Sequence, residues 1–206
     1  MKTLSIEERK NVTREKALEL LIKGNERFIN NLSTNKNHLE VLSEFSKEQK
    51  PFALIISCMD SRAPVEIIFD QGIGDLFSVR VAGNIINEDI IASTEFAIDK
   101  VGIKLIMILG HTNCGAMNAC INNIRNGYLK YLVNKIEPSY LKFKDEIDSS
   151  EHPTDELAKY NANESAKVLI DKSEIIQQAL KNKKIAVVTA IYSLNTGKVD
   201  LLEIIK

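Results

Sequence analysis

The stretch Phe52-Ala-Leu-Ile-Ile56, followed at once by Ser57-Cys-Met-Asp-Ser-Arg62, decides the fold. Its first five residues form an unbroken apolar run, as expected of a strand that is buried on both faces inside a parallel sheet. The residues that follow place a cysteine, an aspartate and an arginine directly after that strand. In open parallel sheets, ligands bind beyond the carboxyl ends of the strands, so we expect the functional site there.

Strand and helix patterns alternate on the C-terminal side of this stretch. They predict further strands at residues 76–81, 103–109 and 184–191, and helices at residues 88–101, 114–144 and 154–180, the second interrupted near Gly127 and Pro138. A turn signal at Asn195-Thr-Gly197 precedes a last short strand at residues 199–204. The alternation favours a fold of the α/β class, with a parallel four-stranded sheet core flanked by helices and a short C-terminal edge strand.

About 50 residues precede the first strand and form an N-terminal helical arm. Helical spacing predicts one helix over residues 13–31, with Thr13 near its N-cap, and a second short helix over residues 38–47. We divide the chain into the arm, residues 1–50, and an α/β part that carries the expected functional site, residues 51–206, within one structural domain. The arm must pack against something, and a neighbouring subunit could provide that surface.

Composition excludes several classes of partner. The chain has 206 residues, of which 44% are hydrophobic and 27% charged, the balance of an ordinary globular protein. Lysine and arginine (27) nearly cancel aspartate and glutamate (28), so no basic field attracts nucleic acid or an anionic membrane surface. We therefore expect no nucleic-acid partner and no membrane partner.

The apolar stretches and the N-terminal segment indicate where in the cell the protein is expected. Runs such as Leu105-Ile-Met-Ile-Leu109 fall far below the roughly 20 residues that span a bilayer. The segment from Met1 to Lys10 is charged and lacks the apolar core of a secretory signal, so we expect a cytoplasmic protein. Cysteine is also too rare for a disulfide scaffold, with three residues at positions 58, 114 and 120.

Metal-capable residues follow two of the predicted strands. The strand ending near residue 56 leads into Cys58, Asp60 and Arg62, and the strand ending near residue 109 leads into His111 and Cys114. Because parallel strands end at the same edge of a sheet, the two segments point their side chains at one place. Two cysteines and one histidine form one of the catalytic zinc sets, in which the fourth position stays open for water or substrate.

Each half of this pattern is weak by itself. An HxxC spacing often arises by chance, and a lone cysteine after a strand is most often a small buried hydrophobe. Both segments fall at strand ends, however, and one of them also supplies an acid and a base two residues apart. We interpret the combination as functional, whereas we interpret Cys120 as a core residue.

The segments Cys58-Met-Asp-Ser-Arg62 and His111-Thr-Asn-Cys-Gly115 resemble the paired CxDxR and HxxCG motifs of β-class carbonic anhydrases. Phe77, Arg80-Val-Ala-Gly-Asn84 and Glu95 stand in the same register. The resemblance implies a zinc enzyme that hydrates carbon dioxide reversibly to bicarbonate and a proton by means of zinc-bound hydroxide. It also implies a homo-oligomer, a dimer or a dimer of dimers, with active sites at the subunit interface.

Carried over by position, the resemblance makes Cys58, His111 and Cys114 the zinc ligands, and it makes Asp60 and Arg62 the acid–base dyad beside the metal. Three further positions are implied to contact substrate: Gln49 through a hydrogen bond, Phe77 as an aromatic wall, and Phe96 where related enzymes often carry tyrosine. The chemistry of the reaction adds Gly115, whose backbone N–H at a helix start could meet a carbonate oxygen.

Asp60 is expected to bind zinc only conditionally, as a fourth ligand. Family members that close the site in this way have a bicarbonate pocket built from a tryptophan, an arginine and a tyrosine. Arg80 matches the arginine, but the chain has no tryptophan, and Ile55 stands at the expected position. We therefore expect Asp60 to pair with Arg62 and to leave the fourth position to water, hydroxide or a small anion.

Two alternatives stay open at the level of sequence. The same scaffold could hydrolyse carbonyl sulfide or carbon disulfide, because zinc-bound hydroxide can attack either linear electrophile. A non-catalytic zinc or redox-sensing module could use the thiolates as a switch. The presence of Asp60 and Arg62 argues against that module, because a structural zinc site needs a fourth ligand rather than an acid–base dyad.

Overall fold

The computed structural model describes residues 5–34 and 38–206 and contains one five-stranded sheet in the order β2-β1-β3-β4-β5. Its strands are β1 (Ala53–Ser57), β2 (Leu76–Arg80), β3 (Leu105–His111), β4 (Ala186–Tyr192) and β5 (Val199–Ile205). The first four strands pair in parallel, and β5 pairs antiparallel with β4 at the edge. The predicted α/β class, with four parallel strands and a C-terminal edge strand, is confirmed.

The strands in the middle of the sheet are buried over their whole length. Every residue of β1, β3 and β4 is buried, whereas β2 at one edge is partly exposed. Apolar β-branched and aliphatic residues fill these strands because helices cover both faces of the sheet and leave no solvent side. The unbroken apolar runs in the sequence therefore identified the central strands correctly.

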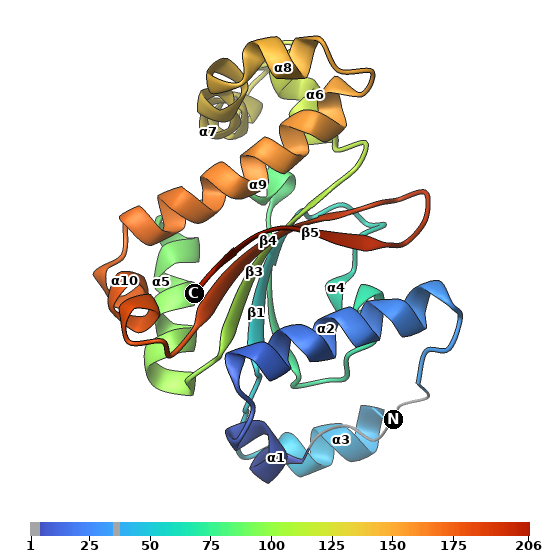
Figure 1. The fold of residues 1–206 in the computed structure, drawn as a ribbon, viewed down its shortest axis with the longest axis vertical. Coiled ribbons are helices and arrows are strands. Elements are labelled where there is room, and N and C mark those ends of the chain that lie inside the picture. The colour runs from blue at the N-terminus through green and yellow to red at the C-terminus, as the bar shows by residue number, and fades with distance from the viewer. Residues whose placement is uncertain (1–4, 35–37) are drawn as a thin grey trace.

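Helices form two layers and a cap (Figure 1). One face of the sheet packs against α2 (Arg14–Ile29) and α4 (Val65–Ile68). The other face packs against α5 (Glu88–Phe96), η2 (Ala97–Val101), α9 (Pro153–Asp171) and α10 (Glu174–Lys181). Beyond the carboxyl ends of the strands lie α6 (Gly115–Ile121), α7 (Leu129–Lys142) and α8 (Lys144–Asp148). The remaining elements are α1 (Ile6–Lys10), α3 (His38–Phe45) and the 3-10 turn η1 (Ala82–Asn84).

The helix predicted over residues 13–31 lies on the sheet of its own chain. Thr13 caps α2 by accepting a hydrogen bond from the Lys16 backbone N–H at 3.2 Å. The buried Asn25 amide bonds Gly197 O at 2.8 Å and accepts from the Val199 N–H at 2.9 Å. Several apolar residues of α2 are also buried in the core of the same chain, so this helix has a packing surface without a partner subunit.

Two predicted helix boundaries were wrong. Pro138 does not interrupt a helix but lies inside α7, where the buried Val133 and Ile136 hold the turn that precedes it against the core. The helix predicted over residues 154–180 is two helices, because Ser173 leaves helical geometry and caps α10 through its hydroxyl, 3.2 Å from the Ile176 N–H.

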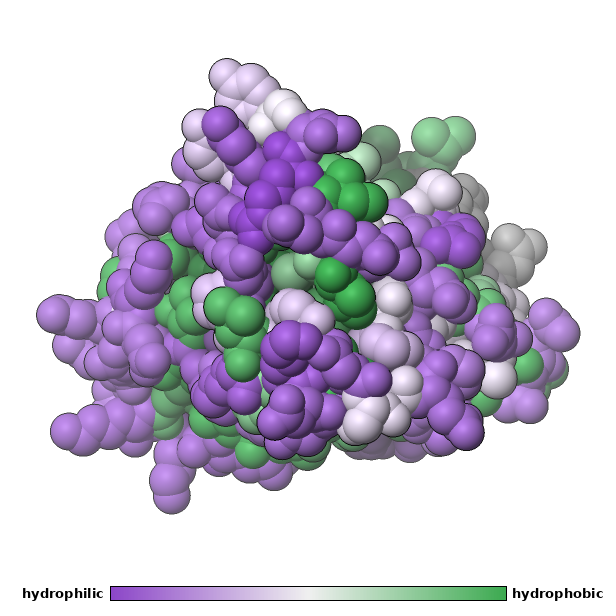
Figure 2. Space-filling model, turned by 90° about the horizontal axis from the view of Figure 1, so that it is seen from above, coloured by the Kyte–Doolittle hydropathy of each residue, from purple (hydrophilic) through white to green (hydrophobic). Residues whose placement is uncertain are grey.

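Seen from above, the molecule is mostly hydrophilic, with small separate hydrophobic patches between the polar side chains (Figure 2). Over the described ranges, no helix combines the length and the apolar character that crossing a membrane requires.

Candidate metal centre

Three metal-capable side chains meet at the carboxyl edge of the sheet. Cys58 directly follows β1, His111 is the last residue of β3, and Cys114 precedes the first turn of α6. Their ligand atoms all lie within 4.8 Å of one another, and all three residues are buried. A tetrahedral zinc ion holds two thiolates and one imidazole roughly 3.5 to 3.8 Å apart, so the observed cluster has about the right size.

The His111 ring is oriented toward this cluster. Its Nδ1 lies 2.9 Å from the carbonyl oxygen of Thr112, which fixes the proton on Nδ1 as a donor. Its Nε2 is buried and has no hydrogen-bond partner. Metal-bound histidines commonly donate their other ring N–H to a carbonyl in this way, so the orphaned Nε2 fits a metal ligand.

The two cysteines shift each other's pKa in opposite directions. Cys114 donates a hydrogen bond to Cys58, which is the main reason that the pKa of Cys58 falls to about 4, while burial opposes the change. The backbone N–H of Gly83, 3.4 Å away, also donates to the Cys58 sulfur. The same hydrogen bond raises the pKa of Cys114. A divalent cation bound between the two sulfurs would favour deprotonation of both cysteines and let both thiolates act as ligands.

The pKa of His111 depends on burial and on the neighbouring Cys58. Burial disfavours the charged ring, but the adjacent Cys58 outweighs this effect and raises the pKa of His111. The lowered pKa of Cys58 favours a thiolate at this position, and a zinc ion would stabilise that negative charge.

Asp60 pairs with Arg62 beside the cluster. The Arg62 guanidinium donates through Nε to Oδ1 at 2.9 Å and through Nη2 to Oδ2 at 2.7 Å. The Arg62 backbone N–H also donates to Oδ1 at 2.9 Å. The guanidinium bonds hold the pKa of the Asp60 carboxyl well below its usual range. Asp60 is outside the group of clustered ligand atoms, which consists of Cys58, His111 and Cys114.

Arg80 and Gly83 brace the Cys58 loop, a role that the sequence did not reveal. Arg80 donates through Nε to the Cys58 carbonyl at 3.2 Å and through Nη2 to the Asp60 carbonyl at 2.5 Å. Gly83 has a φ of 69°, a left-handed conformation that glycine adopts easily, and this brings its N–H to the Cys58 sulfur. Both residues stand in the Arg80-Val-Ala-Gly-Asn84 segment, which resembled the family motif but was given no such function.

The predicted substrate residues do not lie together in one chain. Gly115 begins α6, next to Cys114, and its Cβ position is open, with no atom within 4 Å. Gln49 is exposed and precedes β1, at the opposite end of that strand from Cys58. Phe77 and Phe96 line a separate hollow of about 400 Å³. Within one chain, only Gly115 therefore lies beside the metal ligands.

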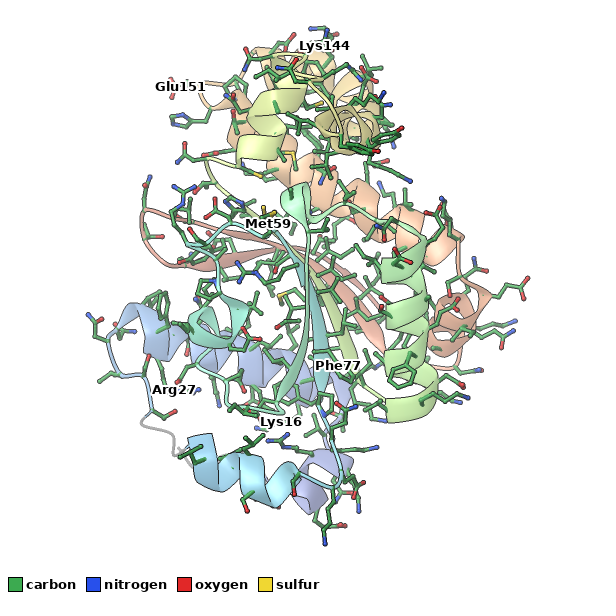
Figure 3. All side chains as sticks on the ribbon, turned by 180° about the vertical axis from the view of Figure 1, so that it is seen from behind. Lys16, Arg27, Met59, Phe77, Lys144 and Glu151 are labelled. Carbon is green, nitrogen blue, oxygen red and sulfur yellow. The ribbon has the colours of Figure 1, made fainter. Side chains whose placement is uncertain are left out.

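The sheet register explains this separation. Phe77 pairs with Leu54 near the beginning of β1, whereas Ser57, next to Cys58, pairs with Arg80. Figure 3 shows Met59, which follows Cys58, near one end of the sheet and Phe77 toward the other. Cys120 is 4% exposed and lies outside the ligand group, as expected of a core residue.

Fold and site together define the class, an α/β protein whose buried Cys₂His cluster fits the ligand set of a catalytic zinc site. A family model described as carbonic anhydrase matches residues 53–199. Carbonic anhydrase 2 of Mycobacterium tuberculosis is 34% identical over 191 residues, which cover 90% of this chain and 91% of that protein. The chain belongs to the carbonic anhydrase family and to its β class.

Solved structures agree with this assignment. The β-carbonic anhydrase CafA of Aspergillus fumigatus is similar with a TM-score of 0.74 and 27% identity, over 90% of this chain and 90% of that chain. A tetrameric β-carbonic anhydrase of Sordaria macrospora shares the fold with a TM-score of 0.74 and 21% identity, over 90% of this chain and 96% of that chain. The family comprises zinc-dependent carbonate dehydratases, which are lyases, and this chain is an enzyme of that kind.

Proposed function

We propose that this chain catalyses the reversible hydration of carbon dioxide, in which carbon dioxide and water give bicarbonate and a proton. The observation that carries the proposal is the buried trio of Cys58, His111 and Cys114, with an ion-paired carboxylate beside it. When bound there, zinc supplies a water that ionises near neutral pH, a property for which carbonic anhydrase is itself the standard example.

Asp60 and Arg62 orient the reaction. Because two bonds from Arg62 keep the carboxylate ionised and fixed in direction, Asp60 accepts a hydrogen bond from the attacking oxygen and aims its lone pair at the substrate carbon. The pair thus orients the attacking oxygen toward the substrate carbon, which helps because carbon dioxide is a weak electrophile. With Asp60 engaged by Arg62, the fourth metal position is left to water or a small anion.

A second copy of the chain completes the substrate pocket in this proposal. Gly115 offers its backbone N–H to a carbonate oxygen beside Cys114. Gln49, Phe77 and Phe96 lie away from the candidate metal centre of their own chain. We therefore assign them to the active site of a neighbouring subunit. The family relation supports a homo-oligomer, a dimer or a dimer of dimers, and the Sordaria macrospora enzyme is tetrameric.

Metal analysis combined with a hydration assay tests the proposal. The purified protein is expected to bind about one zinc ion per chain, and Cys58→Ala, His111→Ala or Cys114→Ala should remove metal and activity together, because three residues must complete the shell. Cys120→Ala is the matched control and should keep both. Full zinc occupancy in any ligand variant would show that the ligand is wrongly assigned.

Parallel assays separate carbon dioxide from its sulfur analogues. Carbonyl sulfide and carbon disulfide are linear electrophiles that the same site could attack, and the entrance to the site decides between them. Higher kcat/KM for either sulfur compound than for carbon dioxide would overturn the proposed substrate. A zinc-loaded protein inactive on all three would instead indicate the non-catalytic module.

A further inference from the structure

The loop between two of the metal ligands has an unusual backbone. His111 ends β3 and Cys114 precedes α6, so only Thr112 and Asn113 connect them. Asn113 has a φ of 53°, in the left-handed region that residues other than glycine seldom adopt. Asparagine tolerates this region better than most residues.

A carboxylate from a distant part of the chain holds this residue. The Asn113 backbone N–H donates to Asp155 Oδ1 at 2.6 Å, across 42 positions of sequence. Asp155 lies in the first turn of α9, which begins beside the loop that leaves β3 (Figure 1). A bond from a peptide N–H to a carboxylate is stronger than one between neutral groups, so it can select one backbone conformation.

The packing of α9 fixes the position of this carboxylate. Gly110, the residue before His111, lets the helix approach so closely that a Cβ there would lie 3.1 Å from the Ala158 carbonyl oxygen. Leu157 and Ala158 are fully buried against the same cluster that contains both ligand cysteines. Asp155 is therefore held on a rigid helix that is anchored next to the ligand it influences.

Thr112 is held from the other side. Its backbone N–H donates to the Tyr192 carbonyl at 3.0 Å, and its hydroxyl accepts from the Leu194 N–H at 3.0 Å. With the β4 end fixing Thr112, the Asn113 peptide is the remaining point at which the loop could turn. Rotation there would move Cys114 relative to His111.

We propose that Asp155 is a positioning residue of the metal centre, which holds Asn113 in its left-handed conformation so that the Cys114 sulfur and the His111 Nε2 face the same ion. The inference rests on the zinc site of the proposed function. Metal-ligand supporting groups of this kind commonly change metal affinity about 10- to 100-fold when removed.

Zinc affinity of the full-length protein, measured by competition with a chromophoric chelator, tests this role without reference to activity. Asp155→Ala should weaken zinc binding at least about tenfold. Asp155→Asn keeps an acceptor oxygen and should stay within about threefold of the wild type. Glu156→Ala is the matched control, because it removes a second acid from the same first turn of α9 and should leave zinc affinity unchanged.

Asp155→Ser guards against a folding defect, since serine is favoured at helix starts but is too short to reach Asn113. It should lose zinc affinity as the alanine variant does, and the cobalt-substituted forms of both should show altered thiolate-to-metal absorption. Wild-type affinity in the alanine and serine variants, or an equal loss in Glu156→Ala, would overturn the proposal. Absence of carbon dioxide hydration in the wild type would leave this result unaffected.

Discussion

Arg62 shows how a surface ion pair can matter for chemistry rather than for stability. Its side chain is 57% exposed while that of Asp60 is 17% exposed, and exposed pairs contribute only about 0–1 kcal/mol to folding. The guanidinium nevertheless binds both carboxylate oxygens, which fixes the direction of the Asp60 lone pairs. Loss of the pair should therefore change catalysis more than it changes the fold.

Substitution of Arg62 tests this separation. Arg62→Ala should lower kcat/KM by roughly 10- to 100-fold while zinc content and melting temperature stay near those of the wild type. Arg62→Lys should recover little, because an ammonium cannot make the two parallel bonds. Parallel measurement of kinetics, metal content and thermal unfolding checks the expectation, and a variant that loses zinc along with activity would contradict it.

Cys120 provides a pH-dependent prediction at the same scale. Burial raises the pKa of its thiol to about 11, whereas an unfolded cysteine titrates near 9. Between these values the unfolded chain releases a proton that the folded chain keeps, so the stability from the neutral buried thiol is present below about pH 9 and is lost as the pH rises toward 11.

Urea unfolding at pH 8 and pH 10 measures this effect. The wild type should lose more free energy of unfolding between the two pH values than Cys120→Ala does, because the variant lacks the titrating group. Other groups titrate equally in both proteins, so the difference isolates Cys120. Identical losses would mean that the thiol is not held neutral by burial.

At the scale of helices and strands, the sequence predicted the central strands better than the ends of the helices. The central strands were predictable because burial on both faces demands unbroken apolar residues, and the metal ligands were predictable because they follow such strands. The ends of helices depend on contacts that sequence does not show. Ser173 starts α10 by accepting a hydrogen bond from the Ile176 N–H, and Asp155 reaches Asn113 only after the chain has folded.

Helix α2 carries a similar hidden constraint at Gly24. In an exposed helix interior, alanine is better than glycine by about 1 kcal/mol. Here a Cβ would lie 1.7 Å from the carbonyl oxygen of Phe69, a backbone atom that cannot move aside cheaply. Contact between α2 and the chain after α4 therefore requires glycine at this position.

Gly24→Ala should accordingly destabilise the protein by about 1–3 kcal/mol, the usual range for overpacking. Lys23→Ala, on the exposed side of the same helix, should change stability by no more than about 0.5 kcal/mol. Urea unfolding of the two variants decides the matter. A Gly24→Ala protein as stable as the wild type would show that α2 can move away from Phe69 without cost.

In the whole molecule, the candidate metal centre and the hollow lined by Phe77 and Phe96 lie at different places on the sheet. Cys58 and Cys114 lie at the carboxyl edge, whereas Phe77 and Phe96 line a hollow along the outer strand β2. Phe96 is 53% exposed in the single chain, which is unfavourable for a large aromatic residue bordering an apolar depression. A second chain seated over this hollow would bury Phe96 and bring the two phenylalanines to another metal centre.

Light scattering should therefore give a mass at least twice the 23.1 kDa of one chain. Phe96→Glu places a charge in the proposed interface, so it should shift the protein toward the monomer and lower kcat/KM at least about tenfold while zinc stays bound, since a buried unpaired charge opposes association. Tyr128→Glu is the control, because Tyr128 is 86% exposed on the chain just before α7 and lines a different hollow. A fully active monomer, or equal behaviour of the two glutamate variants, would exclude an active site shared between chains.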